Sequence, residues 1–146
     1  MRPNALITSL LAIIVQWAVN SPHILATALV GSYAQGTARL DSDIDIMVIT
    51  SNPEFFRQET QWIYEIGWDQ LGLSIAGWKD AEYGLVRSRH VLLSNGLEVE
   101  FSFGLPQWAA IDPIDAGTKQ VILDGCWILL DPTGLLNQLL QHATQG

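Results

Sequence analysis

The first half of the chain alternates apolar and polar blocks whose lengths predict a helix followed by two strands. Residues 4–19 are largely apolar, and their less apolar positions recur every fourth residue, which is typical of a mostly buried amphipathic helix. Residues 24–30 form a continuous apolar run of strand length. Residues 43–49 (DIDIMVI) are β-branched and alternate at first, so they are also predicted to be a strand. Between these strands, residues 31–42 are predicted to form a loop with room for one helical turn.

The second half predicts two further helices, with irregular chain between them. Pro53 stands near the first position of a helix predicted to extend to about residue 71. Residues 106–117 are expected to be irregular, and the pattern of residues 118–123 does not distinguish a helix from a strand. After a short predicted strand at 127–130, Asp131-Pro132 resembles a helix N-cap followed by proline, starting a last helix to about residue 142.

A β-hairpin is predicted between these helices. Residues 83–93 and 97–103 flank Asn95-Gly96, a dipeptide that favours a type I′ turn. Residues 73–78 form a further short predicted strand. The element order predicts an α/β (α+β) domain, with helices on a mixed, partly antiparallel sheet.

Length and composition fit this interpretation. The 146 residues suit a single domain covering 1–146, and 49% of them are hydrophobic, which excludes a disordered chain. Seven Lys or Arg stand against fifteen Asp or Glu, giving a formal charge of −8. Nucleic-acid binding needs clustered cations, so neither a nucleic-acid partner nor a polymerase role is expected. Binding of one metal-complexed nucleotide is not excluded.

Cysteine content and the N-terminal segment indicate the compartment. Cys126 is the single cysteine, so no internal disulfide can form and a cytoplasmic location is expected. The apolar N-terminal stretch is too short and too interrupted to be a transmembrane helix, so no membrane partner is expected.

The candidate chemistry centres on two aspartates. Asp43 and Asp45 are two residues apart on a predicted strand, so their side chains should point to the same face. Two adjacent carboxylates repel each other unless a cation lies between them. Oxygen ligands of this kind suit a hard ion such as Mg²⁺, although a D-x-D pattern alone is a weak signal.

Two other segments could complete such a site. Gly31-Ser32 follows an apolar strand, and a glycine there lets the backbone approach a phosphate closely, although a plain surface turn would use the same residues. Glu98 and Glu100 share one face of the second hairpin strand and offer a third carboxylate. An ordinary strand with acids facing water would show the same pattern, and periodicity does not choose between the two glutamates.

The segment GSYAQGTARLDSDIDIMV, residues 31–48, resembles the polymerase-β-like nucleotidyltransferase superfamily. It is most similar to the small bacterial domains known as minimal nucleotidyltransferases. The likeness extends loosely over residues 4–103, and it implies a mixed sheet backed by helices.

The resemblance also implies roles for individual residues. Gly31 and Ser32 would hold the β- and γ-phosphates of an NTP, expected to be ATP. Asp43 and Asp45 would bind two Mg²⁺ ions, and Glu100 would be the third catalytic and metal-binding acid, with Glu98 as the alternative. An acceptor hydroxyl would attack the α-phosphorus in line, and pyrophosphate would leave.

Other polar residues receive weaker interpretations. Arg39 lies just before the acids and could contact a phosphate or be a solvated loop charge. Arg87 and Arg89 share a strand face and are expected to be solvated. Three histidines lack metal-like spacing and are expected to be structural or exposed: His23, His90 and His142.

The acceptor is the most open question. Larger members of the superfamily carry a helical acceptor-binding domain, which is not expected in residues 1–146. The resemblance therefore implies a partner protein, such as the helical HEPN partners of minimal nucleotidyltransferases in toxin–antitoxin pairs, or a homo-oligomer. Three hypotheses follow: an active nucleotidyltransferase, a non-catalytic antitoxin-like module that binds such a partner, and an aminoglycoside-type transferase acting on a small molecule.

Overall fold

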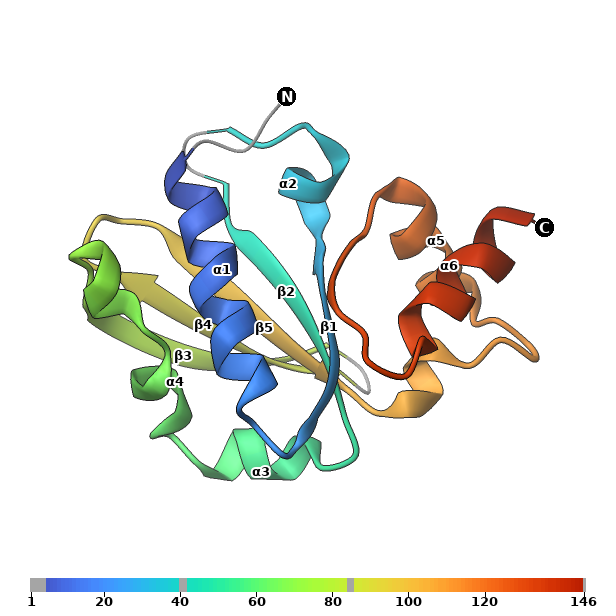
Figure 1. The fold of residues 1–146 in the computed structure, drawn as a ribbon, viewed down its shortest axis with the longest axis horizontal. Helices are drawn as coiled ribbons and strands as arrows, with labels where there is room; N and C mark the ends of the chain where they lie inside the picture. The colour runs from blue at the N-terminus through green and yellow to red at the C-terminus, as the bar shows by residue number, and fades with distance from the viewer. Residues whose placement is uncertain (1–4, 40–41, 84–85, 146) are drawn as a thin grey trace.

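The computed structural model describes residues 5–39, 42–83 and 86–145, which form a six-stranded mixed sheet with helices on both faces (Figure 1). The strand order is β3-β4-β5-β2-β1-β6. β2 and β5 pair in parallel, and the other neighbouring strands pair antiparallel. The predicted fold class is therefore confirmed. The strands are β1 Ile24–Val30, β2 Ile44–Thr50, β3 Ile75–Tyr83, β4 Val86–Leu93, β5 Glu98–Gly104 and β6 Trp127–Leu130.

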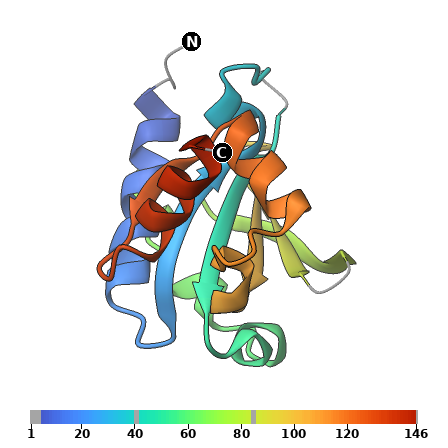
Figure 2. The ribbon, with the colours of Figure 1, turned by 90° about the vertical axis from the view of Figure 1, so that its right-hand side faces the viewer.

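The helices divide between the two faces of the sheet, as Figures 1 and 2 show. One face carries α1, α3 and α4, and the other carries α5 and α6 near β1 and β6. None of the helices in the described residues has the length and hydrophobicity needed to span a bilayer. The α-helices are α1 Ala5–Val19, α2 Gly31–Gln35, α3 Pro53–Gln58, α4 Trp62–Glu65, α5 Ala116–Asp124 and α6 Leu135–Gln145, and the 3₁₀ helices are η1 Trp68–Leu71 and η2 Pro106–Ala109.

The larger core lies under α1, α3 and α4 and is built around aromatic rings. Trp17 stacks on Trp62 with ring centroids 5.3 Å apart, and Phe56 stacks on Phe103 at 4.7 Å. Phe101 packs edge-on against Trp62. Rings of this size bury much apolar surface in specific geometries, so they hold the strands that carry the acids in fixed positions.

The smaller core covers only part of the opposite face. Met47 and Ile49 of β2 pack there with residues of α5 and α6. Further across this face, β4 and β5 carry polar side chains instead, which the register aligns in rows: Ser88 opposite Ser102 and His90 opposite Glu100. This polar half of the face is where the candidate site lies.

The predicted helix from Pro53 to residue 71 is wrong, because the segment is broken into α3, α4 and η1. Glu59 and Ile66 adopt extended backbone at the two breaks. Two buried indole groups donate hydrogen bonds to main-chain oxygens of this segment. The Nε1–H of Trp62 donates to Phe56 O, and the Nε1–H of Trp68 donates to Ile63 O. A buried Trp N–H needs a partner, and the broken helix supplies it.

The β4–β5 hairpin is confirmed, but its turn is not type I′. A type I′ turn needs positive φ at both central residues, and among the described residues only glycines have positive φ. Gly96, with φ of 91°, instead ends a three-residue loop closed by Leu93 pairing with Leu97. The pairing of β4 with β5 is therefore shifted by one residue from the type I′ register.

Towards the C-terminus the prediction is partly correct. Strand β6 coincides with the predicted 127–130. The segment around residues 118–123 forms helix α5, capped by Asp115, whose carboxylate accepts from Thr118 N–H. The last helix begins at Leu135 rather than at Pro132, although the Asp131 carboxylate still accepts backbone N–H groups of its first turn.

Arg89 is the clearest departure from the expected pattern of charge, because its side chain is only 2% exposed. Its guanidinium donates to the Asp80 carboxylate at 2.7 and 3.1 Å and to the main-chain oxygens of Arg57 and Glu59 at 2.9 and 2.8 Å. It also lies over the ring of Trp78, 4.3 Å from its centroid. Arg89 thus satisfies the carbonyls at the end of α3, on the face opposite the acids.

We expect Arg89→Leu to lower the free energy of unfolding by about 2–3 kcal/mol, because it removes the donors of four hydrogen bonds made by a buried guanidinium. Arg57→Leu is the matched control: its side chain is 47% exposed, and its ion pairs with Glu54 and Glu82 lie at the surface. Its cost should stay below about 1 kcal/mol. Urea unfolding measures both, and equal costs would show that Arg89 does not hold the end of α3.

Candidate active site

Four carboxylates come together on the polar half of the sheet. Asp43 lies immediately before β2, and Asp45 is its second residue. The parallel register places Asp45 directly beside Glu100 of β5. Glu98 lies two residues earlier on the same face of β5, next to Asp43. The structure therefore brings together the two aspartates and both candidate glutamates.

Electrostatic strain marks this cluster. Burial, together with a hydrogen bond to Glu100 and repulsion from the same carboxylate, raises the pKa of Asp45 from its usual 3.8 to about 7. Burial and the neighbouring Glu98 likewise raise the pKa of Asp43. Adjacent carboxylates behave in this way when no cation compensates them. Without a cation, the cluster retains protons that isolated aspartates lose.

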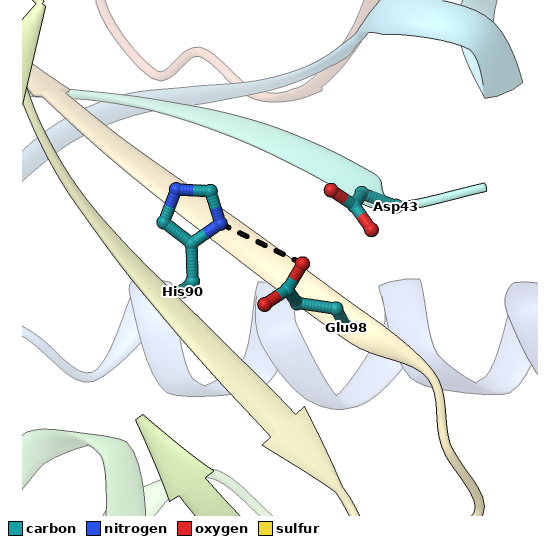
Figure 3. Close-up of side chains that lie close together, drawn as sticks. All are labelled: Asp43, His90 and Glu98. Atoms are coloured by element: carbon teal, nitrogen blue, oxygen red, sulfur yellow. Dashed lines mark ion pairs between the residues drawn. The ribbon is translucent and has the colours of Figure 1, made fainter. Parts of the chain in front are cut away.

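His90 completes the cluster, although the sequence assigned it no part in the site. Its Nε2 lies 3.5 Å from Glu100 Oε1, and its Nδ1 lies 3.7 Å from Glu98 Oε2. Figure 3 shows the ring beside Glu98, with Asp43 facing both. The sequence signal at the turn pointed away from this, because a type I′ turn would pair His90 with Phe101, whereas the observed turn pairs it with Glu100.

Gly31 is required by the close approach of Asp45. Its φ is 75°, and a Cβ at this position would overlap Asp45 Oδ2. The Asp45 carboxylate therefore lies against the glycine backbone where β1 meets α2. The predicted turn at Gly31-Ser32 and the predicted acid thus belong to one constellation.

The remaining candidates are placed less closely. Ser32 is half-buried in α2, and its carbonyl accepts from Thr37 N–H at 3.0 Å. Arg39 is exposed, and its backbone N–H donates to Ser42 Oγ at 2.7 Å, next to Asp43. Phosphate contact by Ser32 or by the Arg39 guanidinium stays a prediction.

The donor set fits divalent cations. Four carboxylates lie in a half-buried cluster in which Asp43 and Asp45 have raised pKa values. Magnesium prefers oxygen ligands and keeps coordination positions for water and substrate phosphates. Asp43, Asp45 and Glu100 could supply such ligands, with Glu98 beside them.

Comparison with known proteins adds the family. The family model described as a nucleotidyltransferase domain matches residues 14–101, more than half of the chain. The chain belongs to this nucleotidyltransferase family. The match ends just after Glu100 and so includes Gly31 and the whole acid cluster. Comparison with curated proteins gives no match.

Solved structures show that this chain shares its fold with longer enzymes. An aminoglycoside 6-adenyltransferase from Bacillus subtilis matches with a TM-score of 0.53 and 17% identity, over 75% of this chain and 37% of that chain. A CCA-adding enzyme matches with a TM-score of 0.50 and 17% identity, over 96% of this chain and 33% of that chain. The nucleotidyltransferase thus corresponds to about a third of each enzyme's length.

We expect Gly31→Ala to be more damaging than positive φ alone explains, because the new methyl group must displace the Asp45 carboxylate. Gly72→Ala is the matched control: Gly72 has φ of 70°, and a Cβ there meets nothing within 4 Å. Gly72→Ala should cost about 1 kcal/mol of unfolding free energy. Gly31→Ala should cost measurably more and should also weaken Mg²⁺ binding in calorimetry, whereas equal effects of the two variants would contradict the contact.

The cluster should also make stability depend on pH. Because the pKa of Asp45 is raised to about 7, the folded protein holds a proton there that the unfolded chain releases near its usual 3.8. Stability without divalent ions should therefore fall as pH rises from about 4 to about 7. The Tm measured in a chelator at several pH values tests this. Asp45→Asn should flatten the pH profile, and an unchanged slope in that variant would contradict it.

Proposed function

We propose that this protein transfers AMP from ATP to a hydroxyl acceptor and releases pyrophosphate. The observation that carries the proposal is the four-carboxylate cluster with Asp45 packed against Gly31, within the region matched by the nucleotidyltransferase family. In this reaction the acceptor oxygen bonds to the α-phosphorus, the bond from that phosphorus to the bridging oxygen breaks, and pyrophosphate leaves.

Each residue then has a role that follows from its position. Asp43, Asp45 and Glu100 hold two Mg²⁺ ions, which when bound neutralise the phosphates and stabilise the attacking and leaving oxygens. Gly31 leaves room for the triphosphate beside Asp45, and Ser32 and Arg39 bind its phosphate oxygens. Glu100, the acid beside the acceptor, takes up the hydroxyl proton.

The acceptor is proposed to be a partner protein. In this proposal, residues 1–146 supply the nucleotidyltransferase domain, and another chain supplies the acceptor side. The resemblance to minimal nucleotidyltransferases favours a helical HEPN-type partner, and a second copy of this chain is the other candidate.

Labelling with α-³²P-ATP and Mg²⁺ tests transfer, with a bacterial lysate as a mixed pool of acceptors. We expect label on an acceptor with the wild type, background label with Asp43→Asn or Asp45→Asn, and a loss of about a hundredfold or more with Glu100→Gln. Asp69→Asn is the control, because Asp69 is an exposed acid on η1, outside the cluster.

Nucleotide binding separates the alternatives. If calorimetry shows Mg²⁺-dependent ATP binding but no acceptor is labelled, the transfer proposal fails, and a non-catalytic antitoxin-like module is favoured. Label found only on an added aminoglycoside would instead favour a small-molecule transferase.

A further inference from the structure

One part of the acid cluster has a donor set unlike the rest. Asp43, His90 and Glu98 each offer one ligand atom, and these atoms all lie within 4.8 Å of one another. Figure 3 shows the three side chains turned toward a common point. Three atoms at this spacing can reach a single metal ion.

The sheet fixes this arrangement from three separate elements. Asp43 immediately precedes β2, His90 lies in the middle of β4, and Glu98 begins β5. β5 pairs with both β2 and β4, so backbone hydrogen bonds set the spacing of His90, Glu98 and Ile44, the residue that follows Asp43. The His90 side chain is only 10% exposed and that of Glu98 27%, so neither is a freely moving surface group.

The four carboxylates also separate into two pairs. Asp45 lies directly beside Glu100 in the parallel register, and Asp43 neighbours Glu98. This pairing leaves two places where a divalent ion can meet carboxylate oxygens. One lies by Asp45 and Glu100, within the proposed magnesium set, and the other lies by Asp43 and Glu98, where the His90 ring is within reach.

The two positions differ in the metal they prefer. Asp45 and Glu100 offer oxygen, which suits Mg²⁺. An imidazole nitrogen beside two carboxylates suits first-row transition metals, whose affinities for nitrogen donors exceed that of Mg²⁺. We propose that Asp43, His90 and Glu98 form a binding site for a divalent transition-metal ion, adjacent to the proposed magnesium ligands Asp45 and Glu100. Asp43 belongs to the proposed magnesium set as well.

Calorimetric titration with Co²⁺ and with Mg²⁺, without nucleotide, tests the proposal. We expect His90→Gln to weaken Co²⁺ binding by at least about tenfold, while Mg²⁺ binding changes by less than about threefold. Gln keeps the polarity of the position but removes the imidazole. His142→Gln is the control, because His142 is exposed on α6, and it should leave Co²⁺ binding unchanged.

A second measurement needs no variant and so is independent of any folding defect. In protein labelled with ¹⁵N-histidine, Zn²⁺ should shift a ring-nitrogen resonance of His90 at one equivalent. The proposal is overturned if Zn²⁺ shifts only His23 or His142, or if folded His90→Gln binds Co²⁺ as the wild type does. Because no nucleotide is present, either result is independent of whether the protein catalyses transfer.

Discussion

Parallel pairing of β2 with β5 is the constraint on which the candidate site depends. It places Asp45 beside Glu100 and brings Asp43 near Glu98, and it does so with backbone hydrogen bonds that side-chain repulsion cannot easily displace. The repulsion between the carboxylates does not push the side chains apart. It raises the pKa values of Asp43 and Asp45 instead. A divalent cation would remove that repulsion, so the arrangement favours metal binding before any substrate is present.

The two faces of the sheet have different roles in this arrangement: one holds the strands in place, and the other carries the acids. On one face, the aromatic core around Trp62 and Phe101 fixes the strands against α1, α3 and α4. On the other, α5 and α6 pack over β1 and part of β2, and the four acids beyond them are half-buried. Arg89 belongs to the first face, where it closes the end of α3, although it neighbours His90 in the chain. Alternation along β4 thus separates a structural cation from the polar residues of the site.

Much of the fold follows from local patterns, and the errors have identifiable physical causes. β1, β2 and α1 were predictable because apolar run length and periodicity report burial directly. The break between α3 and α4 was not, because it depends on tertiary hydrogen bonds from Trp62 and Arg89 to main-chain carbonyls. In the site, the resemblance implied that Gly31, Asp43, Asp45 and one of the two glutamates lie together, whereas alternation alone left this open. Which glutamate lies beside which aspartate needed the strand register.

His90 shows how much one residue of register can decide. A two-residue turn at Asn95-Gly96 would have placed His90 opposite Phe101, on the aromatic core face, and Val91 opposite Glu100. The three-residue loop that ends at Gly96 reverses both assignments, so the apolar Val91 is buried in the core and the imidazole joins the carboxylates. Burial of Val91 favours the observed register over the alternative, since a slip would move every side chain of β4 to the other face relative to β5. The hydrophobic core therefore selects the register, and the register in turn sets the donor atoms of the site.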